Sequence, residues 1–205
     1  MSSSSFLTNP RASLIADASV VINLNATARA ADIIKATPNP FIVTENACAE
    51  LEAGVRNGHR DYAQLLELID AGHVQRAHLG NAGLSVYESL IDGSTMLTLD
   101  DGEAATIAHA QETAGVALID ERKARTLCAA SFPSLVVACT VELLMHDTIA
   151  AALGPDGQAD ALASALTTAR MRVPPEHLAR VRAMIGAERA AACSSLPKAA
   201  RGAAA

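Results

Sequence analysis

The sequence predicts an α/β fold with a central, mainly parallel sheet. Short apolar runs alternate with segments of helical spacing, and this alternation is typical of parallel strands joined by helices. The composition agrees, because the chain has 44 Ala among 205 residues, no Trp, three Phe and two Tyr. A core of Ala, Leu, Ile and Val suits close packing of helices on a sheet, whereas a β-sandwich relies on aromatic and β-branched residues.

The apolar runs give the expected strands in order. They are residues 13–16, 41–43, 73–79, 116–119 and 135–137. The expected helices, identified by spacing and by terminal residues, are 26–36, 44–54, 61–71, 84–92, 100–115, 121–130, 140–152, 156–169 and 175–186. Thr44 is the expected N-cap of one helix, and Gly54 and Gly72 are expected to end two of them.

Composition divides the chain into four parts. We expect a disordered N-terminus over residues 1–12, the α/β domain over 13–153, a helical extension over 154–186 and an Ala-rich tail over 187–205 that is disordered or weakly helical. No apolar run approaches about 18 residues, so no membrane span is predicted. The N-terminus has no secretory signal, and the four cysteines have no CxxC spacing. We therefore expect a cytoplasmic protein with reduced thiols and no zinc site.

Charge is unevenly distributed along the chain. Residues 1–169 carry a net charge of −11, and residues 170–205 carry +5. An acidic body does not suit a protein that coats duplex nucleic acid, but it is compatible with a cation-loaded carboxylate site. Two alternatives stay open for the basic segment: it extends a nucleic-acid path, or it pairs with the acidic body or another subunit. Its arginines are Arg170, Arg172, Arg180, Arg182 and Arg189.

Four carboxylates are predicted to meet at one edge of the sheet. Asp17 and Asp120 directly follow expected strands, while Glu50 and Glu103 lie early in helices that start at the same edge. Ligands bind beyond the carboxyl ends of parallel strands. Each acid alone has a simpler explanation as a turn former, a helix cap or part of a solvated helix face. In this alternative, Asp100, Asp101 and Glu103 serve the dipole of one helix, and Asp120 and Glu121 cap the next.

Gathered carboxylates need a positive neutraliser. Their mutual repulsion raises their pKa values unless a cation offsets it, and Mg²⁺ and Mn²⁺ prefer oxygen ligands. A site built from acids alone, without His or Cys, therefore indicates metal-assisted phosphoryl transfer.

Three segments that carry these acids resemble the PIN-domain family. Residues 14–24 read LIADASVVINL and are similar to the family's opening, in which an apolar strand precedes the first acidic ligand, here Asp17. Residues 43–54 read VTENACAELEAG and are similar to its second segment, which maps its glutamate onto Glu50. Residues 99–125 read LDDGEAATIAHAQETAGVALIDERKAR and resemble a subgroup with a D-x-GEA…LIDERKAR signature.

This resemblance covers residues 13–150 and implies a three-layer α/β/α PIN-like fold. It places the third and fourth acids at Glu103 and Asp120. It implies a Mg²⁺- or Mn²⁺-dependent endoribonuclease that cuts single-stranded or structured RNA. Many bacterial members are toxins of toxin–antitoxin pairs, so an antitoxin protein and a homodimer are implied partners. The resemblance implies metal-binding and catalytic roles for Asp17, Glu50, Glu103 and Asp120.

The chain departs from the subgroup after the last expected strand. A Gly-Thr-x-Gly-like turn is usual there, but this chain has Cys139 and Glu142 in place of the two glycines and keeps Thr140. The alternatives for Glu142 are an added carboxylate near the site or a solvent-facing side chain, and we expect the second.

Five further residues are expected to contact the substrate. Ser19 and Thr140 are suited to orient a water or a phosphate oxygen. Arg122, Lys123 and Arg125 lie just past Asp120 and are suited to contact the RNA backbone, although a solvated helix face explains them equally well.

Two other hypotheses differ in class. In the first, the PIN-like fold is a catalytically weak binding module that acts through association with itself or with a protein partner. In the second, Asp17 is the nucleophile of an aspartyl-phosphate enzyme. A haloacid-type phosphatase needs an aspartate two residues later, where this chain has Ser19, so this hypothesis ranks last.

Overall fold

The computed structural model describes residues 5–92 and 99–202, and these form two compact units. The sheet unit comprises residues 5–21, 38–92 and 99–139. The helical unit comprises residues 22–37 and 140–202. Residues 22–37 thus group with the C-terminal helices. The four-part division expected from the sequence has no such grouping, and its boundaries remain predictions.

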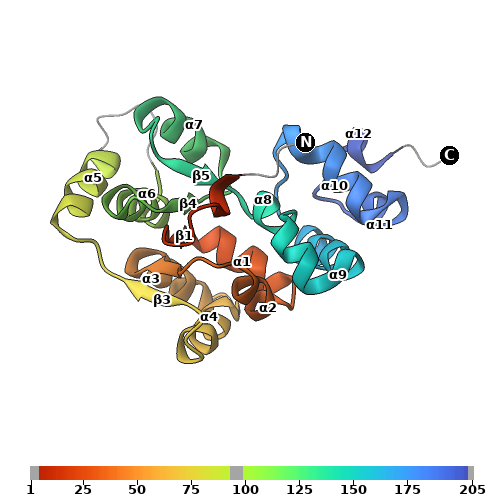
Figure 1. The fold of residues 1–205 in the computed structure, drawn as a ribbon, viewed down its shortest axis with the longest axis horizontal. Helices are drawn as coiled ribbons and strands as arrows, with labels where there is room; N and C mark the ends of the chain where they lie inside the picture. Colours follow the sequence, from red (N-terminus) through yellow and green to blue (C-terminus); the bar gives the residue numbers. More distant parts are fainter. Residues whose placement is uncertain (1–4, 93–98, 203–205) are drawn as a thin grey trace. The chain divides into compact units, whose positions relative to one another are not determined.

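A five-stranded parallel sheet is the centre of the sheet unit (Figure 1). Each strand pairs in parallel with its neighbours in the order β3-β2-β1-β4-β5. The strands are β1 Leu14–Ala16, β2 Phe41–Thr44, β3 Gln75–Ala77, β4 Val116–Leu118 and β5 Val136–Ala138. With its flanking helices this sheet confirms the predicted three-layer α/β/α class, and every predicted strand is present.

The register brings two predicted site segments to one edge of the sheet. Ala16 of β1 pairs with Val43 of β2 on one side and with Leu118 of β4 on the other. Every residue of β1 and β4 is at most 2 % exposed, as expected for central strands covered on both faces. Asp17 follows β1 directly, and its backbone N–H donates to the Leu118 carbonyl at 3.2 Å. The chain therefore leaves β1 and β4 side by side.

Helices cover the sheet within the sheet unit. They are η1 Ser5–Leu7, α3 Glu45–Val55, α4 Asp61–Asp70, α5 Asn81–Ile91, α6 Asp101–Thr113 and α7 Arg122–Ser131. Helix α6 packs against β1, β2 and β4, because its residues from 102 to 110 are all buried and include several alanines that permit close approach. Helix α1, Ala18–Ala26, begins in the sheet unit and ends in the helical unit.

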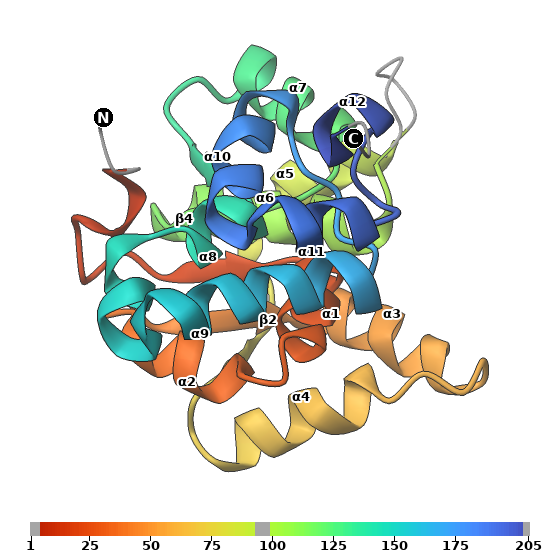
Figure 2. The same ribbon diagram turned by 90° about the vertical axis from the view of Figure 1, so that its right-hand side faces the viewer.

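The helical unit is built around α9. Figure 2 shows α9 beside α10 and α11, and α2 also packs against it. The elements are α2 Ala30–Ala36, α8 Thr140–Leu144, α9 Asp147–Thr168, η2 Pro175–His177, α10 Leu178–Ile185, α11 Ala187–Ala192 and α12 Lys198–Arg201.

Several predicted helices have different bounds in the structure. The helix expected over 84–92 is Asn81–Ile91, and the one expected over 175–186 is divided into η2 and α10. The one expected over 26–36 starts at Ala30, because Ala28 has a left-handed φ of 56° that separates α1 from α2. The one expected over 140–152 divides at His146, whose side chain accepts from the Thr148 backbone N–H at 3.2 Å and caps α9. Helix α9 continues to Thr168 with a local break at Gly154, where φ is 72°.

Both described ends of the chain are more ordered than expected. Phe6 and Leu7 are 5 % and 6 % exposed, so burial of apolar surface orders the segment from residue 5. In the tail, Ala190, Cys193 and Leu196 are at most 1 % exposed. Of the two alternatives given for the tail, disordered or weakly helical, residues 187–202 therefore adopt the helical one, in α11 and α12. Residues 1–4 and 203–205 lie outside the described residues.

The thiols and the helix lengths agree with two further predictions. All four cysteines are buried, and none forms a disulfide. Among the helices that the structure describes, none combines the length and the apolar character needed to cross a bilayer.

Candidate metal centre

Asp17 is the centre of the acidic edge. Its carboxylate is 4 % exposed, and its Oδ2 atom accepts from the hydroxyl of Ser19 at 2.6 Å and from the Ser19 backbone N–H at 3.3 Å. Its Oδ1 atom is buried and has no hydrogen-bond partner among the described residues. Leaving a buried carboxylate oxygen unsatisfied is costly, so this atom is suited to a ligand.

Two acids from other elements join Asp17. One carboxylate oxygen from each of Asp17, Glu50 and Asp100 lies within 4.8 Å of the others. Glu50 comes from the middle of α3, and Asp100 is the N-cap residue of α6. From the sequence, Asp100 is expected only to serve the start of a helix. The signal for it was the first letter of the D-x-GEA motif, which Asp100 occupies in this chain.

Glu103 is hydrogen-bonded to Asp100 but is not among the three acids whose oxygens meet, so its role as a metal ligand stays a prediction. It is 5 % exposed and forms a capping box with Asp100. The Glu103 backbone N–H donates to Asp100 Oδ1 at 2.8 Å, and the Asp100 backbone N–H donates to Glu103 Oε2 at 3.4 Å. The box satisfies two donors at the start of α6. It also fixes Asp100 in the orientation in which it meets Glu50.

Asp120, the fourth predicted acid, follows β4 by two residues and is half-buried. It lies at the predicted edge but is not one of the three acids whose oxygens meet, as far as the described residues show. Its neighbour Glu121 raises the pKa of Glu103. Its role as a metal ligand stays a prediction.

The carboxylates repel one another at a site where Asp17 and Glu103 are buried while Glu50 and Asp100 are exposed. Burial, with repulsion from Asp100, raises the pKa of Asp17 to about 6. Burial, with repulsion from Asp100 and Asp17, raises the pKa of Glu50 to about 7 and that of Glu103 to about 7. No lysine, arginine or histidine of residues 5–92 and 99–202 forms an ion pair with any of them. Among the described residues, no ion pair therefore offsets the charge of Asp17, Glu50, Asp100 or Glu103.

These observations fit a hard divalent cation. The donor set is composed of oxygens, one of them is buried without a partner, and the acids come from three separate elements. Mg²⁺ and Mn²⁺ prefer such donors. A cation would supply the charge that the protein does not.

Gly102 makes the close approach of these acids possible. A Cβ atom at this position would lie 2.6 Å from Glu50 Oε2 and 3.2 Å from Asp17 Oδ1. Any side chain larger than hydrogen would therefore displace the Glu50 carboxylate. Glycine at position 102 therefore leaves the space that the carboxylates of Glu50 and Asp17 occupy.

The predicted substrate-binding residues fall into different environments. Ser19 is hydrogen-bonded to Asp17, as described above. Arg122, Lys123 and Arg125 occupy the first turn of α7 in the sheet unit; Arg122 is exposed and the other two are half-buried. Thr140 is buried at the start of α8 in the helical unit. Their contacts with substrate remain predictions.

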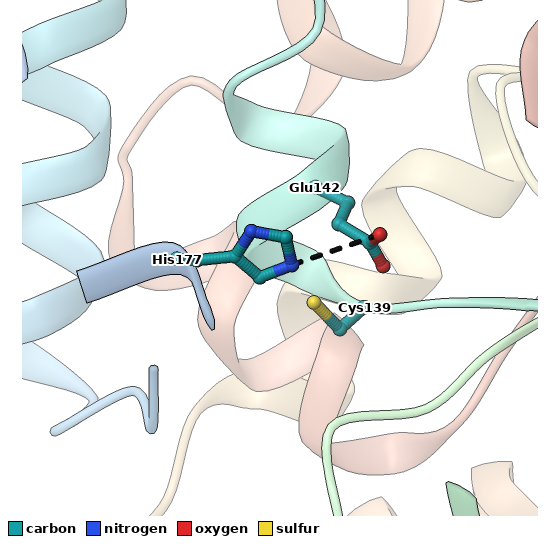
Figure 3. Close-up of side chains that lie close together, drawn as sticks. All are labelled: Cys139, Glu142 and His177. Atoms are coloured by element: carbon teal, nitrogen blue, oxygen red, sulfur yellow. Dashed lines mark ion pairs between the residues drawn. The ribbon is translucent and has the colours of Figure 1, made fainter. Parts of the chain in front are cut away.

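Glu142 differs from the expectation that it faces solvent. Its side chain is 18 % exposed, and its Oε1 atom lies 3.6 Å from Nε2 of His177, which is 20 % exposed (Figure 3). Both residues belong to the helical unit, where η2 brings the imidazole to α8. Partial burial beside a histidine therefore replaces the expected exposure.

Several C-terminal basic residues serve their own unit. Arg180 donates to the Met145 carbonyl at 3.1 Å, Arg201 donates to the Leu196 carbonyl at 2.9 Å, and Arg189 pairs with Asp160 at 2.5 Å. The contact with Asp160 agrees with the pairing alternative for Arg189, and for Arg180 both alternatives stay predictions. These contacts leave part of the basic segment accessible, because 47 % of the Arg189 side chain is still exposed.

Comparison with protein families gives one match. A family model described as a PIN domain matches residues 13–187. The match continues past β5 through α8, α9 and α10. Comparison with curated proteins and with solved structures gives no match.

Proposed function

The chain belongs to the PIN-domain family, whose members are generally metal-dependent nucleases, and on this premise we propose that it hydrolyses RNA phosphodiester bonds. The observation that carries the proposal is the meeting of Asp17, Glu50 and Asp100 around a buried, unpartnered carboxylate oxygen. Such a site accommodates a cation, and a nuclease uses that cation against a phosphodiester.

The acidic residues have two different roles in this proposal. Asp17, Glu50 and Asp100 hold Mg²⁺ or Mn²⁺, and Asp120 and Glu103 complete the acidic wall. When bound, the cation supplies activation of water and stabilisation of the charge that develops on phosphate. Ser19 fixes the orientation of the Asp17 carboxylate through two hydrogen bonds, as outer-shell partners of ligands do.

RNA contacts are proposed for the start of α7. Arg122, Lys123 and Arg125 offer cations within a sheet unit that is otherwise acidic. Because the body repels polyanions, RNA binding is expected to be weak, salt-sensitive and dependent on the metal. With two Tyr and three Phe in the chain, stacking cannot carry much base recognition. Backbone contacts to single-stranded or structured RNA are therefore the expected mode.

The biological setting rests on the family resemblance alone. We propose a bacterial, cytoplasmic protein that acts as the toxin of a toxin–antitoxin pair, with an antitoxin protein as partner and a homodimer as its assembly. A pull-down with the product of an adjacent gene tests the partner.

A second candidate is a binding module with a weakly loaded site. One observation favours it: Leu84 and Ile91, seven residues apart on α5, are 43 % and 39 % exposed, and Val136 is 48 % exposed. Exposed apolar side chains at helical spacing suit a protein partner. This candidate predicts a stable complex without RNA cleavage.

RNA cleavage tests the first candidate. End-labelled, unstructured RNA is incubated with Mn²⁺ and either wild type or Asp17→Asn, and products are resolved on a gel. Because removal of a ligand charge forfeits several kcal/mol of stabilisation, we expect Asp17→Asn to cut at least about 100-fold more slowly. The matched control is Asp160→Asn, at a position that is 61 % exposed in the helical unit. Cleavage by Asp17→Asn at the wild-type rate would contradict the proposal.

A further inference from the structure

Asp101 joins three helices beside the acidic group. It is the first residue of α6, between Asp100 and Gly102. Its Oδ1 atom accepts from the hydroxyl of Tyr87 on α5. Its Oδ2 atom accepts from Nδ2 of Asn46 on α3 at 3.2 Å. Both oxygens are thus used, and each is held by a different helix.

Helix α5 is attached to α6 at a second place. Glu112, near the end of α6, accepts from the backbone N–H of Gly80 at 2.9 Å, at the start of α5. Tyr87 reaches Asp101 at the opposite end of α6. The two helices therefore run antiparallel and are joined near both ends of α6. The Gly80–Glu112 hydrogen bond therefore holds α5, and with it Tyr87, in place beside Asp101.

The bridge links the elements that carry two of the proposed ligands. Asn46 lies one helical turn before Glu50 on α3, and Asp101 directly follows Asp100. The spacing between Glu50 and Asp100 therefore depends on how α3 and the start of α6 are held together. Repulsion acts to separate them, because a carboxylate oxygen of Glu50 lies within 4.8 Å of one from Asp100.

We propose that Tyr87, acting with Asn46 on Asp101, is a positioning residue that sets the separation of Glu50 and Asp100 for cation binding. This inference rests on the proposed function of the acidic edge. It assigns a role to the hydroxyl of one tyrosine, and it gives Asp101 a structural use distinct from coordination. Outer-shell partners of this kind typically change metal affinity or activity by about 10- to 100-fold.

The test compares the two tyrosines of the chain. Mn²⁺ binding is measured by calorimetry for wild type, Tyr87→Phe and Tyr62→Phe. Tyr62 is the matched control because its hydroxyl bonds Arg76 at 3.2 Å, on the edge strand β3. We expect Tyr87→Phe to weaken Mn²⁺ binding about 10-fold and Tyr62→Phe to leave it unchanged. Asn46→Ala, which removes the second donor, is expected to weaken binding in the same direction.

A double-mutant cycle separates positioning from general stability. If Tyr87 acts through Asp101, adding Tyr87→Phe to Asp101→Ala changes the Mn²⁺ affinity no further. A tyrosine that merely supports the fold would weaken binding equally in both backgrounds. Melting temperatures of all variants are recorded beside the affinities.

The outcomes are distinguishable. Wild-type affinity in Tyr87→Phe, with binding lost in Asp17→Asn, overturns this inference and leaves the proposed function in place. Absence of Mn²⁺ binding by the wild type overturns both. Weakened binding in Tyr87→Phe that disappears in the Asp101→Ala background supports the inference.

Discussion

The acidic edge of the sheet unit and the C-terminal helices use charged and polar groups in opposite ways. In the helical unit these groups meet partners: Arg189 pairs with Asp160, Arg180 donates to a backbone carbonyl and His177 approaches Glu142. At the sheet edge Asp17 and Glu50 meet other acids instead. Several charged groups of the helical unit thus have a partner within that unit, although Nε2 of His177 is buried without a hydrogen-bond partner among the described residues. The sheet edge instead concentrates charge of one sign.

Under the proposed function, this difference separates residues that stabilise the fold from residues that bind a cation. Paired and hydrogen-bonded groups contribute modestly to stability. Acids crowded together oppose folding until something neutralises them, and raised pKa values at such a site indicate function. Substitutions in the two regions should therefore change different quantities: ion binding at the edge, and the free energy of unfolding in the helical unit.

The largest effect on binding short of removing a ligand is expected from Gly102→Ala. The new Cβ atom would lie 2.6 Å from Glu50 Oε2, so the carboxylate must move. Calorimetry should show Mn²⁺ binding weakened by about 10- to 100-fold. The control is Gly54→Ala on α3, where a Cβ atom meets nothing closer than 3.7 Å. Equal Mn²⁺ affinities in the two variants would show that a side chain at position 102 does not disturb the ligands.

The pH dependence of stability should reveal the crowded acids. The pKa of Asp17 is raised to about 6, and those of Glu50 and Glu103 to about 7, from ordinary values of 3.8 and 4.5. As the pH falls from about 8 toward 4, the folded protein takes up protons before the unfolded chain does. Stability of the metal-free protein therefore rises on acidification. In EDTA the melting temperature should increase by several degrees, at about 2–4 °C per kcal/mol for a chain of this size.

The control for this prediction removes the same three carboxylates. The variant Asp17→Asn/Glu50→Gln/Glu103→Gln should lose the gain between pH 8 and pH 6. His109 acts in the opposite sense, because burial lowers its pKa and acidification then favours the unfolded chain. The difference between wild type and the triple variant isolates the acids. If the melting temperatures of the two proteins change equally between pH 8 and pH 6, the prediction is wrong.

In the helical unit, Gln158→Ala should destabilise the fold without changing ion binding. The Gln158 side chain is 4 % exposed and donates to the carbonyls of Leu144 at 2.8 Å and His146 at 3.0 Å. Losing these donors should lower the free energy of unfolding by about 1–3 kcal/mol, measured by urea denaturation. Gln64→Ala, at an exposed position on α4, is the matched control and should be nearly neutral. A weaker Mn²⁺ affinity in Gln158→Ala would contradict the claim that the helical unit affects stability and not ion binding.

The smallest effect is expected for Arg189→Ala. Its ion pair with Asp160 is 2.5 Å long, but the two side chains are 47 % and 61 % exposed. Exposed pairs contribute about 0–1 kcal/mol and are screened by salt. Denaturation at low and high salt should show a difference from wild type that shrinks as salt is added. A larger loss that salt does not affect would mean that Arg189 packs rather than pairs.

Most of the sheet was predictable from the sequence, because every strand except the edge strand β3 lies in a short apolar run. β1 and β4 are buried on both faces, and Asp17 and Asp120 mark where two such runs end. The helix bounds were less predictable, because alanine gives no local signal for a break. Ala28 adopts a left-handed φ within an Ala-rich stretch. The order of α11 likewise depends on burial of Ala190 against the rest of its unit, which local spacing does not reveal.

The candidate site was predictable in its location and only partly in its members. Strand ends and helix starts placed Asp17 and Glu50 at one edge, where the structure brings them together. Asp100 was missed because an acid at an N-cap already has an explanation in the helix itself. Its second contact, with Glu50, depends on how α3 and α6 pack, and the hydrogen bonds of Asp101 depend on the same packing.

Mn²⁺ titration of wild type and Asp17→Asn by calorimetry tests the central claim most directly. The substitution keeps the shape of the side chain and removes one negative charge from a crowded group, so the variant should fold at least as stably. We predict that the wild type binds the ion and that Asp17→Asn loses binding. Wild type that does not bind Mn²⁺, or Asp17→Asn that binds it with unchanged affinity, would contradict the assignment of this edge as a metal centre.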